Sequence, residues 1–360
     1  MPSNPVSARP VSTYVSGRRT RLYSILGLSA ALIAVVALAT SVGSVKIPPP
    51  TTFRILLDGL PFVDIAPTWP GAIATVVLDI RLPRVILAGL VGAALATAGA
   101  TYQGLFRNPL ADPYLIGVAQ GASLGAIVGF LLPVSSPNPV LGFGIIPLLA
   151  FVGALLATAA VYALARVGKT LPVTTLILAG VALGALLGSI VSYLIISSGE
   201  VMHGIIFWLM GSFSLSQWSE IGIVLPYVAV GTGVIIVFAR LLNVMQLDEE
   251  QAQQLGVNVE RLKLVLLAAA TLITAASVSF VGTIGFVGII IPHAVRLIWG
   301  ADHRFLLPLA VLTGAIFMIL TDLVARTVLA PTEIPIGVIT AICGAPFFLY
   351  LLRRRKKVIF

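Results

Sequence analysis

The chain has 360 residues, of which 58% are hydrophobic and only 10% charged, and its mean hydropathy is +1.07. A soluble globular chain carries roughly 25% charged residues, so this composition excludes a soluble fold and indicates a polytopic membrane protein. The formal net charge of +9 does not indicate nucleic-acid binding, because the basic residues flank apolar segments. The one cysteine, Cys343, lies in an apolar run, so there is no disulfide framework and no thiolate metal site.

Residues 1–21 are rich in Ser, Pro and Arg, and we expect them to form a disordered cytoplasmic N-terminus. Arg18 and Arg19 resemble a twin-arginine signal, with residues 39–41 as its cleavage region. We favour a retained first span, because the apolar run at 22–45 is long enough to cross a bilayer and many spans follow it.

Ten apolar segments predict an all-α membrane domain over residues 22–352, followed by a basic cytoplasmic tail at 353–360. The segment 46–80 is expected to lie outside the bilayer, partly as an interfacial helix. The predicted spans are 22–45, 82–106, 114–132, 143–165, 173–196, 220–240, 263–281, 284–299, 305–328 and 336–352.

Glycines recur at every fourth position in two of these spans. The first series is Gly117, Gly121, Gly125 and Gly129, and the second is Gly180, Gly184 and Gly188. Small residues at this spacing let two helices approach closely, so tight packing inside the bundle explains both series. The alternative is a smooth wall along a substrate path or a subunit interface.

The stretch 243–263 is polar and acidic, although apolar runs lie on both sides of it. Asp248 is expected to cap a short helix and to form a capping box with Gln251. Gly256 suits the end of that helix, and Asn258 the cap of a second one. Two interpretations stay open, an ordinary solvated loop and a docking surface for a soluble partner.

The distribution of basic residues predicts the orientation of the spans. If both termini are cytoplasmic, all Lys and Arg residues except five lie on the cytoplasmic side, as the positive-inside rule requires. This orientation places the stretch 243–263 in the cytoplasm. The five outer residues are Lys46, Arg54, Arg81, Arg84 and Arg326.

The sequence carries no recognisable catalytic site. Gly168-Lys169-Thr170 resembles the end of a phosphate-binding loop, but Ala163 occupies the position of its first glycine, so no nucleotide site is encoded. We expect no enzyme activity, metal site or cofactor in this chain. Few charges lie within the spans, where Asp322 and Arg326 are spaced to pair on one helix face. Proton-driven carriers use chains of buried carboxylates, which this sequence lacks, so energy is expected from outside the chain.

Eight ordered stretches resemble one family, the FecCD-type permeases, which are the membrane subunits of importers for vitamin B12, haem and ferric siderophores. The similarity runs from about residue 70 to the C-terminus. The stretches are RLPR at 81–84, QGLFRNPLADPYLIGVAQGASLG at 103–125, LILAGVALG at 176–184, FWLMGSF at 207–213, LDEEQAQQLGV at 247–257, GFVGIIIPHAVRL at 285–297, DHR at 302–304 and EIPIGVITAICGAPFF at 333–348.

The resemblance implies a type II ABC importer permease in a bacterial plasma (inner) membrane. Its partners would be a second copy of the chain, two ABC ATPase subunits that hold ATP and Mg, and an extracytoplasmic binding protein. The implied importer carries a metal chelate, and the small, apolar and hydroxyl residues of 173–196 mildly favour a corrinoid or a siderophore. An ion-gradient-driven carrier and a membrane sensor are the alternatives from other functional classes.

The resemblance also implies roles for residues already singled out. The arginines Arg81, Arg84 and Arg326 would dock the binding protein, with anchoring at the membrane interface as the alternative. The expected translocation path includes Thr174, Thr175, Gly180, Gly184 and Gly188. The expected ATPase-coupling residues are Leu247, Asp248, Glu249, Ala252, Leu255 and Gly256, with Ala252 and Leu255 on the face that fills an apolar cleft of the ATPase.

Overall fold

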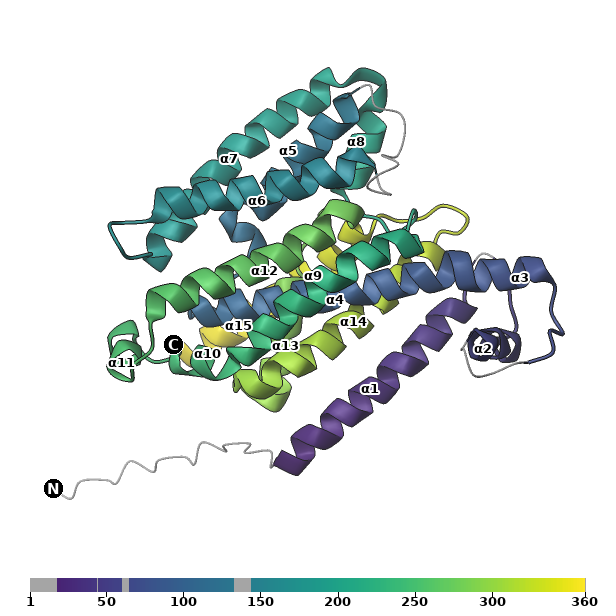
Figure 1. Ribbon diagram of the computed structural model, residues 1–360, viewed down its shortest axis with the longest axis horizontal. Helices are drawn as coiled ribbons and strands as arrows, with labels where there is room; N and C mark the ends of the chain where they lie inside the picture. The colour runs from purple at the N-terminus through teal and green to yellow at the C-terminus, as the bar shows by residue number, and fades with distance from the viewer. Residues whose placement is uncertain (1–17, 44, 60–64, 133–143, 360) are drawn as a thin grey trace.

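The computed structural model describes residues 18–43, 45–59, 65–132 and 144–359, and every named element in these ranges is helical. Eight helices have 20 residues or more, and shorter helices connect them (Figure 1). The long helices are α1 (Arg18–Ser41), α4 (Leu82–Leu105), α6 (Ile145–Ala165), α7 (Val173–Ser197), α9 (Trp218–Val237), α12 (Val259–Val281), α14 (His303–Thr327) and α15 (Ile336–Ile359). The shorter ones are α2 (Pro49–Asp58), α3 (Gly71–Thr75), η1 (Val76–Arg81), η2 (Pro113–Ile116), α5 (Val118–Leu131), η3 (Gly199–Val201), α8 (Met202–Leu209), α10 (Ala239–Val244), α11 (Glu249–Gln254) and α13 (Val287–Trp299).

Seven helices of the described chain are long and apolar enough to cross a membrane. Three of the ten predicted spans fall instead on shorter apolar helices, namely α5, α13 and the first part of α15. The 14 residues of α5 extend only about 21 Å, less than the roughly 30 Å of a hydrocarbon core. This helix packs mainly against α6 and α7.

Several predicted boundaries differ from the structure. Helix α1 already begins at Arg18, so residues 18–21 are helical, while 1–17 lie outside the described residues. The basic tail is not a separate segment, because α15 continues to Ile359. The second span begins earlier than predicted, since α3, η1 and α4 form one continuous helix over 71–105. Its wide π-turn, η1, lies just before Pro83, which lacks the N–H that an α-helix would use there.

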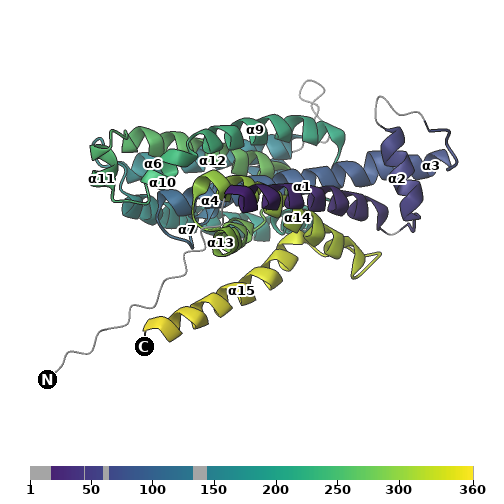
Figure 2. The ribbon, with the colours of Figure 1, turned by 90° about the horizontal axis from the view of Figure 1, so that it is seen from below.

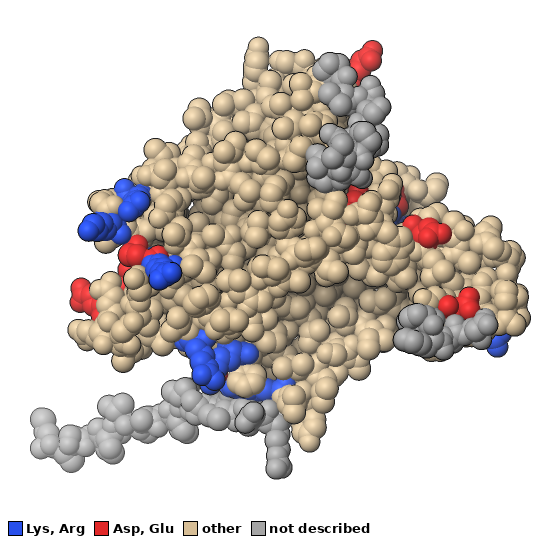
Figure 3. Space-filling model, viewed as in Figure 1, with Lys and Arg blue, Asp and Glu red and all other residues tan. Residues whose placement is uncertain are grey.

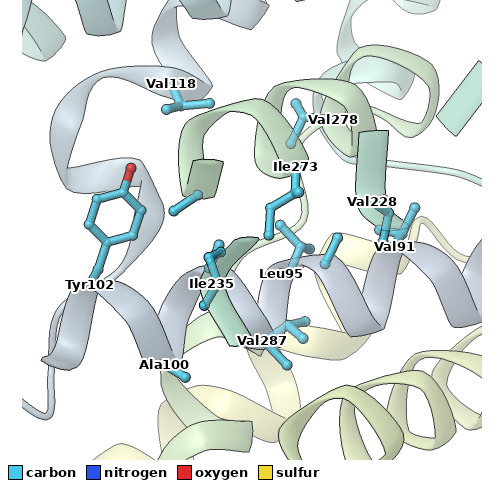
Figure 4. Packing of buried hydrophobic residues seen from close by; sticks show 14 of the residues in the cluster. Val91, Leu95, Ala100, Tyr102, Val118, Val228, Ile235, Ile273, Val278 and Val287 are labelled. Carbon is cyan, nitrogen blue, oxygen red and sulfur yellow. The ribbon is translucent and has the colours of Figure 1, made fainter. Parts of the chain in front are cut away.

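Helix α4 lies at the centre of the bundle and is buried along most of its length. Its side chains Val91 and Leu95 belong to one apolar cluster with side chains from α9, α12 and α13 (Figure 4). Helices α5, α6, α7 and α8 form a separate layer beside this bundle and contact it mainly through α12 (Figure 1). Figure 2 shows that α15 leaves the bundle at an angle.

Glycine permits backbone contact between several helix pairs. A Cβ atom at Gly121 would lie 2.3 Å from the carbonyl oxygen of Gly153, and one at Gly125 would lie 2.0 Å from that of Leu149. These contacts confirm tight packing for Gly121 and Gly125, here against α6, whereas Gly117 precedes α5 in a turn with a φ of 83°. Helix α4 meets its neighbours in the same way, since a Cβ at Gly99 would lie 2.0 Å from the carbonyl oxygen of Gly288 in α13.

Charged side chains gather at the two ends of the molecule and leave an apolar band between them (Figure 3). Helices α10 and α11, the start of α7 and the C-terminus lie toward one end, hereafter the α11 end (Figure 1). Helices α2 and α3 lie at the opposite end, hereafter the α2 end. This distribution is the one expected of a chain that crosses a bilayer between its two ends.

Candidate functional site

The α2 end contains a buried network around the guanidinium group of Arg84. Its Nε and Nη2 atoms donate to Asp322 Oδ1 at 3.0 and 2.8 Å. Its Nη1 and Nη2 atoms donate to the two carboxylate oxygens of Glu333 at 2.7 and 3.0 Å. One planar guanidinium thus holds two carboxylates, a geometry that only arginine provides. The network joins α4 to α14 and to the loop that precedes α15.

Two further arginines hold the end of α1 against this network. Arg81 donates to the carbonyl oxygens of Thr40 at 3.1 Å and Ser41 at 2.8 Å. Arg326 donates to the carbonyl oxygen of Ala39, and its Nε lies 3.4 Å from Asp322 Oδ2. The last carbonyl groups of a helix have no partner within the helix and carry its negative dipole end. The two arginines therefore cap α1.

All three predicted docking arginines are buried in this chain, with Arg81 5%, Arg84 9% and Arg326 7% exposed. The predicted pair of Asp322 and Arg326 is confirmed, although Asp322 makes shorter contacts with Arg84. The docking role stays a prediction, while the hydrogen bonds assign these side chains a structural role.

Three loops that carry family-like stretches meet beside this network. The amide of Ser212 donates to the carbonyl oxygen of Val281 at 2.9 Å, and the amide of Ile336 donates to the carbonyl oxygen of Gly211 at 3.0 Å. The hydroxyl of Ser214 donates to Glu333 at 2.6 Å. Burial tends to raise the pKa of Glu333, but the hydrogen bonds from Arg84 and Ser214 outweigh it and lower the pKa below its usual value. Sequence reasoning missed Glu333 and Ser214, although Glu333 opens one of the family-like stretches.

The predicted path residues on α7 differ in their surroundings. Gly180 is buried, and a Cβ there would lie 2.0 Å from the carbonyl oxygen of Leu115, so this glycine packs against η2. Gly188 has open space where a Cβ would point. Thr174 is exposed at the α11 end, whereas the hydroxyl of Thr175 donates to the carbonyl oxygens of Ala165 and Pro172 at 2.9 Å each. Most of α7 is exposed in the single chain.

The polar stretch at the α11 end forms short helices, as predicted. Gly256 ends the turn after α11 with a φ of 82°, and Asn258 caps α12 by accepting from the amide of Arg261 at 3.0 Å. The predicted capping box at Asp248 is wrong, because this side chain makes no cap hydrogen bond. Its carboxylate instead pairs with Arg107 at 2.7 Å.

The apolar face of this stretch also differs from the prediction. Ala252 is fully buried within the core, so it cannot fill a cleft of a partner. Leu247 and Leu255 are 44% and 65% exposed. Leu255 lines an open groove of 500 Å³ together with Phe238, Leu241 and Val257. The α11 platform, defined as residues 247–257, therefore presents two exposed leucines, of which Leu255 lines an apolar groove.

Glu249, the remaining predicted coupling residue, is only partly exposed. Its carboxylate lies 2.8 Å from Nζ of Lys263, a residue that sequence reasoning left without a role. Lys263 also contacts Glu260 at 3.2 Å.

The two ends described above belong to a chain whose sequence matches a known family of membrane transport proteins. A sequence model of the FecCD transport family matches residues 31–354, nearly the whole chain. The chain belongs to the FecCD transport family. It is a multi-pass membrane permease of ABC importers, which confirms the all-α class and the resemblance seen in the sequence.

Two curated members of the FecCD family are similar over most of their length. The cobalamin import system permease protein BtuC of Halobacterium salinarum is 49% identical over 287 residues, 80% of this chain and 76% of that protein. The hemin transport system permease protein HmuU of Yersinia pestis is 42% identical over 285 residues, 78% of this chain and 84% of that protein.

The fold agrees with a solved structure described as an inward-facing conformation of a metal-chelate type ABC transporter. The TM-score is 0.79 at 30% identity, and the match covers 92% of this chain and 99% of the other. The arrangement of helices is therefore that of a type II importer permease.

Proposed function

We propose that this FecCD permease carries a metal chelate into the cytoplasm, driven by ATP hydrolysis in a partner subunit. The α11 platform carries the proposal, because it presents exposed leucines beside an apolar groove at a charged end of the molecule. Exposed apolar side chains at such an end suit the docking of a soluble partner. ATP and Mg would lie in that partner, and this chain would need no cofactor.

The transporter would contain two copies of this chain, two ATPases and an extracytoplasmic binding protein. Helix α7 supports the pairing, because the single chain leaves large apolar side chains of this helix exposed, such as Leu178, Tyr193 and Ile196. The binding protein would dock at the α2 end. Arg81, Arg84 and Arg326 would act there from beneath the surface, as three cations that hold α1 and the Glu333 loop around two carboxylates.

The substrate is proposed to be a large chelate that the path holds loosely. Helix α7 carries no charged residue, and its polar side chains are hydroxyl groups such as Thr174 at the α11 end. A path without charge offers no grip on carboxylate side chains such as those of haem, so a corrinoid or a siderophore fits better. The names of the relatives, cobalamin and hemin permeases, support the chelate class.

The chain is proposed to lie in a bacterial plasma membrane with both termini in the cytoplasm. The α11 platform would then face the ATPases, and the α2 end would face the binding protein. Closure of the ATPases would move α11, and this movement would reach the helices that line the path.

Uptake into proteoliposomes tests the proposal. The vesicles would contain this chain, its ATPase and its binding protein, with labelled cobalamin, haem and ferric hydroxamate supplied separately. We expect ATP-dependent accumulation of one compound, and none with a non-hydrolysable ATP analogue. Flux without ATP that follows an ion gradient would contradict the proposal and favour a secondary carrier.

A further inference from the structure

A buried ammonium group connects three elements at the α11 end. Lys263 lies in the first turns of α12 and is only 4% exposed. Its Nζ contacts Glu249 at 2.8 Å, the carbonyl oxygen of Leu171 at 3.0 Å and Glu260 at 3.2 Å. An ammonium group has three donors, and here each has an acceptor. These acceptors belong to α11, to the loop that precedes α7, and to α12.

The same cluster holds the backbone just before α7 at two points. Glu260 uses its second oxygen to accept from the amide of Leu171 at 2.8 Å. The carbonyl oxygen of Leu171 accepts from Lys263. Leu171 is followed directly by Pro172, the N-cap of α7. The backbone of Leu171 is thus held at its N–H by a carboxylate and at its carbonyl oxygen by an ammonium group.

An open cavity of 510 Å³ lies between α11 and the start of α7. Glu249 and Gln253 line one side of it, and Thr170, Val173 and Thr174 line the other. The hydrogen bonds of Lys263 and Glu260 bridge the two sides.

A second ion pair, between Arg107 and Asp248, also reaches α11, but its side chains are 42% and 73% exposed. Solvent screens such a pair, so it contributes little to the stability of the contact between Arg107 and α11. The side chain of Lys263 is only 5% exposed, so water can replace a lost partner less easily there, and its three partners are held together more firmly than the exposed pair.

We propose that Lys263 is the positioning residue that transmits movement of α11 to α7. A displacement of Glu249 with α11 would carry the ammonium group along, and the ammonium group would carry the peptide of Leu171 and the start of α7. This inference rests on the proposed function, in which α11 is driven by the ATPase and α7 lines the path.

The test uses the complete transporter in proteoliposomes and measures substrate taken up per ATP hydrolysed. In Lys263→Met we expect the ATPase to copurify, because Leu247 and Leu255 are untouched, while uptake per ATP falls by about tenfold, within the range of typical coupling effects. Glu260→Gln keeps the shape of the cluster and should give a smaller fall. The matched control is Lys169→Met, which removes an exposed lysine from the same loop and should keep the wild-type ratio.

The ratio of substrate taken up to ATP hydrolysed separates a loss of coupling from a loss of stability. A purely structural role would lower uptake and hydrolysis in proportion to the amount of folded complex, and the ratio would stay unchanged. A wild-type ratio in Lys263→Met would overturn the inference. If that variant yields no folded complex, Glu260→Gln decides, and an unchanged ratio there would overturn it equally. A wild-type complex that shows no ATP-dependent uptake would instead contradict the proposed function.

Discussion

Single residues at the α2 end show how a membrane protein keeps charges away from lipid. Arg84 neutralises Asp322 and Glu333 together, while Arg81 and Arg326 use the carbonyl groups at the end of α1. Burying a charge is costly unless it is paired and hydrogen-bonded, so each of these side chains depends on the others.

Removal of Arg84 should therefore destabilise the fold strongly. In Arg84→Met, Asp322 would stay buried without its main partner, and we expect a loss of about 3–5 kcal/mol in the free energy of unfolding. Thermal unfolding in detergent measures the effect. The double variant Arg84→Met/Asp322→Asn should recover part of the loss, because the orphaned charge is removed. An unfolding temperature equal to wild type in the single variant would contradict this account.

Acid should weaken the same network through Glu333. Its pKa is lowered in the folded chain by its hydrogen bonds, so its contribution to stability is complete above the unfolded value of about 4.3. That contribution is lost as the pH falls through the lower folded value. The difference in unfolding temperature between wild type and Glu333→Gln should thus be constant near neutral pH and should shrink below pH about 4. A difference that stays constant down to acid pH would show that the charge of Glu333 is unimportant.

Glycines at helix crossings form the other sensitive class of residue. A methyl group at Gly99 would collide with the backbone of Gly288, so Gly99→Ala should cost about 1–3 kcal/mol or more through forced separation of α4 and α13. Gly222 in α9 has open space around it and provides the control. Gly222→Ala should be neutral or slightly stabilising, because alanine favours the helix. Unfolding midpoints of the two variants test the contrast.

At the scale of the element, α11 shows what sequence patterns can and cannot predict. The ends of the short helices follow from Gly256 and Asn258, because backbone conformation and local capping are encoded within a few residues. The partners of Asp248 and Glu249 are Arg107 and Lys263, which are distant in sequence or on another helix. No local pattern predicts such pairs, and the same holds for the burial of Ala252.

Leu255, the more exposed leucine of the α11 platform, should contribute more to ATPase binding than the charged residues around it. We expect Leu255→Asp to fold but to lose copurification of the ATPase, since a carboxylate cannot enter an apolar cleft without a partner. Leu255→Met keeps the volume and apolar character and should bind the ATPase as wild type does. Pull-down of the tagged ATPase compares the two variants. Equal recovery with both would remove Leu255 from the docking surface.

At the scale of the whole molecule, the predicted orientation can be measured with single cysteines in a Cys343→Ser background. Lys169 precedes Thr170, which lines the cavity beside α11, and Glu200 lies in η3, directly after the far end of α7. A membrane-impermeant thiol reagent should label Glu200→Cys in intact cells and Lys169→Cys only after permeabilisation. The reverse pattern would invert the topology.

The architecture follows from composition and periodicity more directly than the site does. Apolar length predicts the long helices, because the bilayer requires about 20 apolar residues per span. It is less direct for α5, which has only 14 residues and packs one face closely against α6 through Gly121 and Gly125. The three arginines lie at the end opposite the α11 platform, as the charge count predicted, but a charge count cannot predict that α1 packs against them and buries them.

Backbone contact between helices also determines which parts of the protein can move. Where α5 crosses α6, and where α4 crosses α13, carbonyl groups lie directly against the opposing helix and there is no flexible side chain between them to absorb sliding. Each pair must therefore behave as a single solid block. We expect alternating access to occur as a rotation between these blocks along α12, because α12 makes most of the contacts between the two layers. The transport cycle of this protein is expected to resemble the turning of two rigid bodies about a shared axle rather than the bending of individual helices.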